Sequence, residues 1–183
     1  MVIYISMIRG INVGKQKRIE MQDLKDLYRS LGFNNVKTYI QSGNLIFQFT
    51  ASNTSVLAKK IAQEIKKAYN FDVDVLVLTK NELKKVIDNN PFKDDKSRLY
   101  ITFLGDNLLK NHDINAISNE INRVKDESED FLISKTAVYL FCPNGYGRTK
   151  LSNNFFEKKL HVTATTRNWN TVTKLYAFAA NQQ

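Results

Sequence analysis

The stretch Asn35–Phe49, NVKTYIQSGNLIFQF, predicts a β-hairpin. Its two arms, NVKTYI and NLIFQF, are rich in β-branched and aromatic residues, which favour extended backbone. The turn QSGN stands between them, and its Gly43 permits the positive φ that tight turns require. Helical patterns flank this hairpin on both sides, so only a few arrangements of the first half of the chain are compatible with it.

The elements around the hairpin follow in the order β-α-β-β-α-β. VIYISMI is a first strand, and FDVDVLVL is a last one. The helix before the hairpin is closed by Gly32, and Ser52–Ser55 supply cap candidates for the helix after it. The helical spacing is carried by Met21, Leu24, Leu27, Tyr28 and Leu31 in the first helix and by Ala58, Ile61, Ala62, Ile65 and Tyr69 in the second. This order is typical of ferredoxin-like folds.

The second half of the chain repeats this order approximately. Thr79 and Glu82 form a capping box for a short helix that ends before Pro91. The strands expected after it are RLYITFL, DFLIS, AVYLFC and a short HVTAT, with helices over 114–124 and from Leu151, and a terminal helix through Val172 and Ala179. We therefore predict an α+β protein of two ferredoxin-like (βαββαβ) halves with antiparallel sheets, plus a C-terminal helix. The expected divisions are 1–78, a connecting helix and loop over 79–97, and 98–183.

Composition and charge narrow the function classes. The chain of 183 residues has a formal net charge of +9. Residues 1–19 hold four basic residues and no acid, and residues 131–183 hold seven basic residues against Glu157 alone. The single cysteine, Cys142, excludes an internal disulfide, and with two distant histidines it gives no metal site. No long apolar run or leader is present, which predicts a cytoplasmic protein without a membrane partner.

Two polar loops are predicted to meet at one edge of the first sheet. The first two strands of a β-α-β-β-α-β unit run parallel, so the end of the first strand lies beside the turn after the second. This places RGINVGK and QSGN close together. Each loop taken alone is equally well explained as an ordinary turn. The candidate ligand-binding residues here are Arg9, Gly10, Asn12, Gly14, Gln41, Ser42 and Asn44, and Lys15 is expected to lie beside the same concavity.

Two further basic stretches lie in the second half. NGYGRTKL follows a strand and precedes a helix, and it matches neither the Walker loop nor G-x-G-x-x-G. Its glycines and basic groups suit an anion, whereas the pattern alone favours a plain turn. In TTRNWNTVTKL, Asn168 is a good helix cap, and Trp169 is a core anchor more often than a ligand platform. The candidate ligand-binding residues here are Gly145, Gly147, Arg148, Lys150, Arg167, Asn168 and Trp169.

Taken together, RGINVG, TYIQSGNLIF, PNGYGRTKL and TTRNWNTVTKL resemble a bacterial family known only as domain of unknown function 1697. The four stretches, in this order, lie near both ends of the chain. The resemblance implies a two-part α/β protein with ferredoxin-like halves. It implies no activity, cofactor or catalytic residue. This chain departs from the family pattern at Lys15 and His161, where glycine is usual.

Three hypotheses for function follow. The first is binding of an anionic, phosphate-bearing small molecule or nucleotide by the basic and glycine-containing loops, with the loops of the second half in reach if the halves fold back on each other. The second is nucleic-acid binding by the basic ends, but not by stacking on the sheet, because Leu45, Phe47 and Phe49 are expected to face the helices. The third is a protein-interaction or oligomer scaffold. The sequence assigns no catalytic residue, no metal ligand and no cofactor, and leaves open whether the protein is an enzyme.

Overall fold

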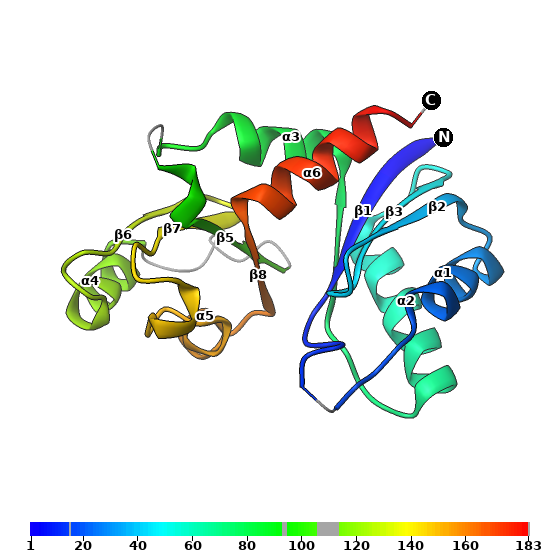
Figure 1. The fold of residues 1–183 in the computed structure, drawn as a ribbon, viewed down its shortest axis with the longest axis horizontal. Helices are drawn as coiled ribbons and strands as arrows, with labels where there is room; N and C mark the ends of the chain where they lie inside the picture. The colour runs from blue at the N-terminus through cyan, green and yellow to red at the C-terminus, as the bar shows by residue number, and fades with distance from the viewer. Residues whose placement is uncertain (15, 93–94, 106–113, 183) are drawn as a thin grey trace. The chain divides into compact units, whose positions relative to one another are not determined.

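The computed structural model describes residues 1–14, 16–92, 95–105 and 114–182 (Figure 1). The chain packs into two compact units. The first consists of Met1–Lys85 with Lys174–Gln183, and the second of Val86–Thr173. The expected division into 1–78, 79–97 and 98–183 stays a prediction. The compact units differ from this division because residues Lys174–Gln183 belong to the first unit and not to the second.

The first unit is a four-stranded antiparallel sheet with the order β2-β3-β1-β4. Its strands are β1 (Val2–Ile8), β2 (Asn34–Tyr39), β3 (Asn44–Phe49) and β4 (Val75–Thr79), and its helices α1 (Met21–Ser30) and α2 (Thr54–Tyr69) lie side by side on one face (Figure 1). The predicted hairpin is present, with Tyr39 opposite Asn44. The order β2-β3-β1-β4 is the ferredoxin-like arrangement that the sequence predicts.

Local signals in the sequence set several ends of these elements. Gly32 follows α1 with φ of 82°, which a residue with a Cβ adopts at a cost. The side chain of Asn53 caps α2 by accepting the Ser55 N–H at 2.8 Å. The predicted capping box starts α3 (Lys80–Asp88), since Thr79 N donates to Glu82 Oε2 at 2.7 Å and Glu82 N donates to Thr79 Oγ1 at 3.2 Å.

The two faces of the first sheet are both covered. Leu45 and Phe47 face the helices, as predicted, and the Phe47 ring lies 4.3 Å from that of Phe33 and 5.5 Å from that of Tyr28. On the other face, the end of α6 (Trp169–Ala180) packs with Phe178 against Tyr39, at 5.4 Å between ring centroids. Sheet-stacked recognition of RNA bases is therefore not available on this sheet.

The second unit repeats the topology with the sheet order β6-β7-β5-β8. Its strands are β5 (Leu99–Leu104), β6 (Asp130–Ile133), β7 (Ala137–Phe141) and β8 (Ala164–Asn168), and its core lies between this sheet and the helices α4 (Ile114–Val124) and α5 (Asn153–Leu160). The last strand begins three residues later than the expected HVTAT. His161 takes a left-handed conformation with φ of 50° where α5 ends, so the strand starts only after that turn.

None of the helices in the described residues combines the length and apolarity needed to cross a bilayer. The cytoplasmic location expected from the sequence stays a prediction.

Candidate functional site

The two loops predicted to meet in the first unit do meet. The N–H of Ile8, at the end of β1, donates to the carbonyl of Gly43 in the β2–β3 turn at 2.8 Å. Met7 stands opposite Asn44 in the β1–β3 ladder. We call the described residues of 9–20 and 40–43 the glycine edge, because the two segments form one end of this sheet.

Asn12 fastens the two segments of the glycine edge to each other. Its Nδ2 donates to the carbonyl of Ile19 at 2.8 Å and to the carbonyl of Gln41 at 2.9 Å. Its Oδ1 accepts the Ile19 N–H at 2.9 Å, and its own N–H donates to the carbonyl of Lys17 at 3.1 Å. The Asn12 amide therefore holds the loop in shape, a role that the sequence alone did not separate from ligand binding.

The backbone of the glycine edge is unusual in its handedness. Of the 11 described residues with positive φ, six lie here: Gly10, Asn12, Gly14, Lys17, Ile40 and Gly43. Positive φ recurs at alternate positions 10, 12 and 14, with values of 71°, 56° and 67°. Alternation of right- and left-handed residues turns successive N–H groups toward one side and produces the concave anion sites called nests.

The charged side chains of the glycine edge are partly engaged with β4 and the residues before it. The guanidinium of Arg9 lies 3.6 Å from the carboxylate of Asp74, and Lys17 Nζ donates to the carbonyl of Asp72 at 2.7 Å. Arg18 and Gln41 are exposed. Lys15 lies outside the described residues.

The remaining predicted residues of the turn serve the hairpin. Asn44 is buried, and its Nδ2 donates to Ser42 Oγ at 2.8 Å and to the carbonyl of Tyr39 at 3.3 Å. Gly43 packs tightly: a Cβ added to it would stand 2.8 Å from Ile11 Cδ1. Gly10 and Gly14 have no atom within 4 Å of such a Cβ, so only their φ angles favour glycine.

NGYGRTKL in the second unit forms a turn that closes on its own backbone. The Gly145 N–H donates to the carbonyl of Cys142 at 2.9 Å, and the Arg148 N–H donates to the carbonyl of Gly145 at 3.1 Å. Gly147, Arg148 and Lys150 are exposed. Helix α5 begins only at Asn153 and is capped by Ser152. The loop therefore offers exposed cations, while the N–H groups of Gly145, Arg148 and Thr149 already donate to backbone carbonyls.

The Tyr146 side chain points inward from this turn and joins a polar network that sequence patterns did not indicate. Its hydroxyl donates to Thr166 Oγ1 at 3.0 Å, and Thr166 Oγ1 donates to Asn153 Oδ1 at 2.6 Å. Thr166 also lies 2.7 Å from Thr102 Oγ1 across the β5–β8 ladder. The network ties the turn to the sheet of the second unit.

The side chains of TTRNWNTVTKL, the remaining basic stretch, mostly contact other parts of the protein. The side chain of Asn168 caps α6, as predicted, by accepting the Thr171 N–H at 2.8 Å. Trp169 is buried, consistent with a core anchor. Arg167 donates to Thr165 Oγ1 at 3.0 Å and to the carbonyl of Thr166 at 2.9 Å. Although the residue as a whole is half-buried, its guanidinium lies deep enough that burial lowers its pKa to about 10, so it stays protonated at neutral pH.

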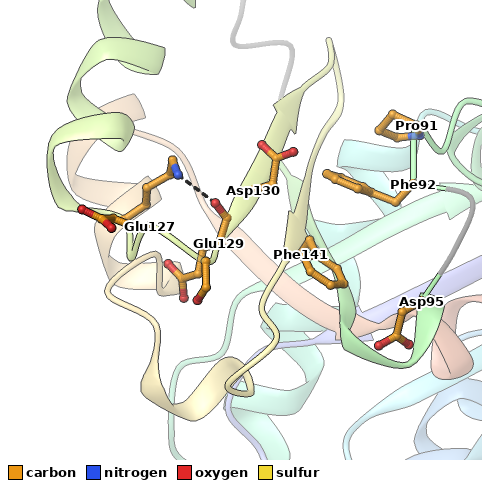
Figure 2. A pocket seen from close by; sticks show the side chains of 9 residues that line it. Pro91, Phe92, Asp95, Glu127, Glu129, Asp130 and Phe141 are labelled. Carbon is orange, nitrogen blue, oxygen red and sulfur yellow. Dashed lines mark hydrogen bonds between the residues drawn. The ribbon is translucent and has the colours of Figure 1, made fainter.

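The second unit contains a cavity of about 660 Å³ that the sequence did not reveal (Figure 2). Its lining comes from three segments: Pro91, Phe92 and Asp95 before β5; Lys125, Glu127, Ser128, Glu129 and Asp130 between the end of α4 and the start of β6; and Phe141 at the end of β7. Asp95, Glu127, Glu129 and Asp130 bring carboxylates to it. Nowhere in the described part of the chain do three or more His, Cys, Asp or Glu side chains gather in a group that could hold a metal ion.

Comparison with known proteins identifies a family and a fold. Residues 1–139 match the family described as "Protein of unknown function (DUF1697)". The match covers the first two stretches quoted for the resemblance and ends before PNGYGRTKL. A solved structure, that of a conserved bacterial protein from Streptococcus pneumoniae, matches with a TM-score of 0.76 and 22% identity over 97% of this chain and 98% of that one. No curated protein matches.

Proposed function

The chain belongs to the DUF1697 family of proteins of unknown function, and we propose that it binds a phosphate-bearing small molecule or nucleotide at the glycine edge of its first unit. The observation that carries the proposal is the alternation of positive φ at Gly10, Asn12 and Gly14, in a loop held against the β2–β3 turn by the Asn12 amide. Such a loop is pre-organised, so an anion that enters it orders little further chain.

Charge supports the same position. Residues 9–18 carry Arg9, Lys15, Lys17 and Arg18 and no acid. The nearby carboxylates of Asp72 and Asp74 are exposed, with Asp74 at 48% side-chain exposure. Ion pairs at such exposure are weak, so these carboxylates neutralise the cations only partly. Arg18 supplies a guanidinium suited to bidentate contact with a phosphate, and Gln41 supplies an exposed amide.

The glycine edge is favoured over NGYGRTKL by its recurring positive φ at positions 10, 12 and 14. Bonded N–H groups do not separate the two loops, because in the glycine edge the N–H groups of Arg9 and Asn12 also donate to carbonyls, at 2.8 and 3.1 Å. In NGYGRTKL, the N–H groups of Gly145, Arg148 and Thr149 all donate to carbonyls within the turn. An anion there would rely on the exposed side chains of Arg148 and Lys150. An acid, Asp126, also lies near this stretch: hydrogen bonds from Ser128 are the main cause of its lowered pKa, and Lys150 makes a smaller contribution.

The test is a thermal-shift screen of the full chain against inorganic phosphate, pyrophosphate, nucleotides, sugar phosphates and short oligonucleotides, followed by calorimetric titration of any hit. A ligand that prefers the native state raises the melting temperature. We expect Arg18→Ala to weaken binding about tenfold or more, because a charge-assisted hydrogen bond contributes about 1.5–3 kcal/mol. Arg9→Ala should weaken it less, since Arg9 is shared with Asp74.

Arg123→Ala is the matched control, because Arg123 is also exposed and lies on α4 of the second unit. Equal affinity in Arg18→Ala, Arg9→Ala and Arg123→Ala would refute the glycine edge as the site. Loss in Arg148→Ala alone would move the site to NGYGRTKL. A shift with oligonucleotides only, falling steeply with salt, would favour the nucleic-acid hypothesis. No shift with any compound would favour the interaction-scaffold hypothesis, which light scattering then tests.

A further inference from the structure

We propose that the ligand of the glycine edge is a nucleotide, whose phosphate is held by the basic loop and whose base packs on the exposed side chains of Val13 and Ile40. The inference rests on the proposed function and adds the class of ligand to it. Its evidence is separate from the evidence for an anion, because it comes from two apolar side chains and not from the cations of the loop.

Val13 and Ile40 are the large apolar side chains that the described residues of the glycine edge present to solvent. Val13 is 70% exposed and Ile40 is 51% exposed. The other exposed large apolar residues in the described part of the chain come from separate elements or from the terminus: Met1, Val56, Ile114, Leu132 and Phe178. Single exposed apolar residues are ordinary on protein surfaces, so the presence of two at one basic edge carries the argument.

The hydrogen bond between Asn12 and Gln41 holds these two residues at the same edge. Val13 follows Asn12 in the chain, and Ile40 precedes Gln41. Asn12 Nδ2 donates to the carbonyl of Gln41 at 2.9 Å. Because consecutive Cα atoms are about 3.8 Å apart, each apolar residue lies one step from an end of this bond. A ligand bound at the loop therefore meets apolar side chains from both segments of the glycine edge.

The Ile40 backbone adopts a conformation that isoleucine normally avoids. Its φ is 51°, which is a genuine outlier for a β-branched residue, whereas asparagine tolerates this region. Packing within the protein does not explain the choice of isoleucine, because half of the residue faces solvent. Residues held in such conformations cluster at ligand-binding sites. We therefore assign the Ile40 side chain to contact with a ligand.

The chemistry of the edge matches a nucleotide better than a sugar phosphate. Valine and isoleucine are stiff at χ1, so they present fixed apolar surfaces on which a planar ring can lie. The exposed amide of Gln41 carries two donors and an acceptor, which suit the polar edge of a base. A sugar phosphate would instead place hydroxyl groups against Val13 and Ile40, and inorganic phosphate would leave both side chains in water.

The experiment is calorimetric titration of the full chain with AMP, ribose 5-phosphate and adenosine. We expect AMP to bind about tenfold more tightly than ribose 5-phosphate, because burial of about 60 Å² of apolar surface corresponds to about a tenfold gain in affinity. The heat-capacity change of binding should be more negative for AMP, which is the signature of apolar burial. Adenosine has no phosphate and should bind more weakly than AMP.

Two substitutions test the apolar contact directly. Val13→Thr keeps the shape of the side chain but adds a hydroxyl, and Ile40→Asn replaces the strained isoleucine. Each should weaken AMP binding severalfold and leave ribose 5-phosphate binding unchanged. Since Ile40→Asn should not lower the stability of the protein, a loss of affinity in this variant cannot come from unfolding. Val56→Thr is the matched control, because Val56 is 61% exposed and lies on α2, outside the glycine edge.

The outcomes separate this inference from the proposed function. Equal affinity for AMP and ribose 5-phosphate, both weakened by Arg18→Ala, would overturn the nucleotide inference and leave the anion site in place. Equal AMP affinity in Val13→Thr, Ile40→Asn and Val56→Thr would do the same. If neither phosphate compound binds, or if Arg18→Ala binds AMP as the unmodified chain does, the proposed function fails and this inference fails with it. Binding of a single-stranded oligonucleotide without binding of AMP would overturn the inference in favour of nucleic acid.

Discussion

Gly43→Ala is the substitution that best tests the geometry of the glycine edge. Gly43 has φ of 70°, and a Cβ there would stand 2.8 Å from Ile11 Cδ1, 2.9 Å from Ile11 Cγ1 and 3.0 Å from Ile8 Cβ. The end of Ile11 could rotate aside, although Ile11 is buried. The Cβ of Ile8 cannot, because it is fixed to the backbone of β1.

The expected loss of stability has three contributions. A left-handed conformation costs an alanine about 1–2 kcal/mol. Overpacking a filled site costs about 1–3 kcal/mol. Alanine regains about 0.4–1 kcal/mol by restricting the unfolded chain. We therefore expect Gly43→Ala to lower the free energy of unfolding by about 2–4 kcal/mol, measured by urea denaturation followed by circular dichroism.

Gly10→Ala is the matched control, because its φ of 71° is almost the same and nothing lies within 4 Å of its added Cβ. It should cost only about 0.5–1 kcal/mol, the net of the conformational contributions. The difference between the two variants isolates the contact with Ile8 and Ile11. If both lose the same stability within about 0.5 kcal/mol, the close packing of the turn against β1 is refuted.

Three further outcomes are expected. Asn12→Ala should lower the free energy of unfolding by about 2 kcal/mol in the same urea assay, because it leaves the Ile19 N–H without its acceptor and removes the hydrogen bond to Gln41. A loss below about 0.5 kcal/mol would contradict the role of Asn12 in holding the loop. Ile40→Asn should raise the free energy of unfolding by up to about 1 kcal/mol, because Ile40 is a β-branched residue with φ of 51°, a conformation that asparagine tolerates better. The Ile40 side chain is 51% exposed, so little packing is lost; any loss of stability would show that the isoleucine side chain is needed. Burial, with a smaller contribution from Glu129, raises the pKa of the Cys142 thiol to about 12 from 9.0. The reactive thiolate is therefore a smaller fraction of the folded protein, and Cys142 should react with a disulfide reagent about 10³-fold more slowly in the folded chain than in urea. Because the folded state holds that proton more tightly, stability should fall as the pH rises from about 9 to about 12, and Cys142→Ala should remove that part of the pH dependence.

Local chemistry explains which parts of the fold the sequence could predict. The hairpin around Gly43, the capping box at Thr79 and Glu82, and the Asn168 cap are each encoded within a few adjacent residues, and all three are present. The meeting of two distant loops was also predictable, because it follows from the parallel direction of β1 and β2. The start of β8 was not, since it depends on the left-handed turn at His161, a conformation that is uncommon for residues other than glycine.

The sites depend on relations that no local pattern contains. Asn12 has the sequence context of a turn residue, and only the fold shows that its amide reaches Gln41, 29 residues away. The acids of the cavity are not recognisable as a group in the sequence, because the whole of β5 and α4 separates Asp95 from Asp130. Cross-strand neighbours such as Asp130 and Phe141 become visible only when the register of β6 and β7 is known. Charge pairing, which decides whether a carboxylate is available, is likewise a property of the folded chain.

The repeated topology does not make the polar loops of the two units equivalent. QSGN joins β2 to β3, and its counterpart in the second unit is the turn between β6 and β7, which contains no glycine. NGYGRTKL follows β7, so its counterpart in the first unit is the connection from β3 to α2. Antiparallel neighbours place the start and end of a strand at opposite ends of a sheet. The glycine edge and NGYGRTKL therefore occupy opposite ends of corresponding sheets, which argues that each loop must be tested by its own substitutions and that neither inherits a role from the other by symmetry.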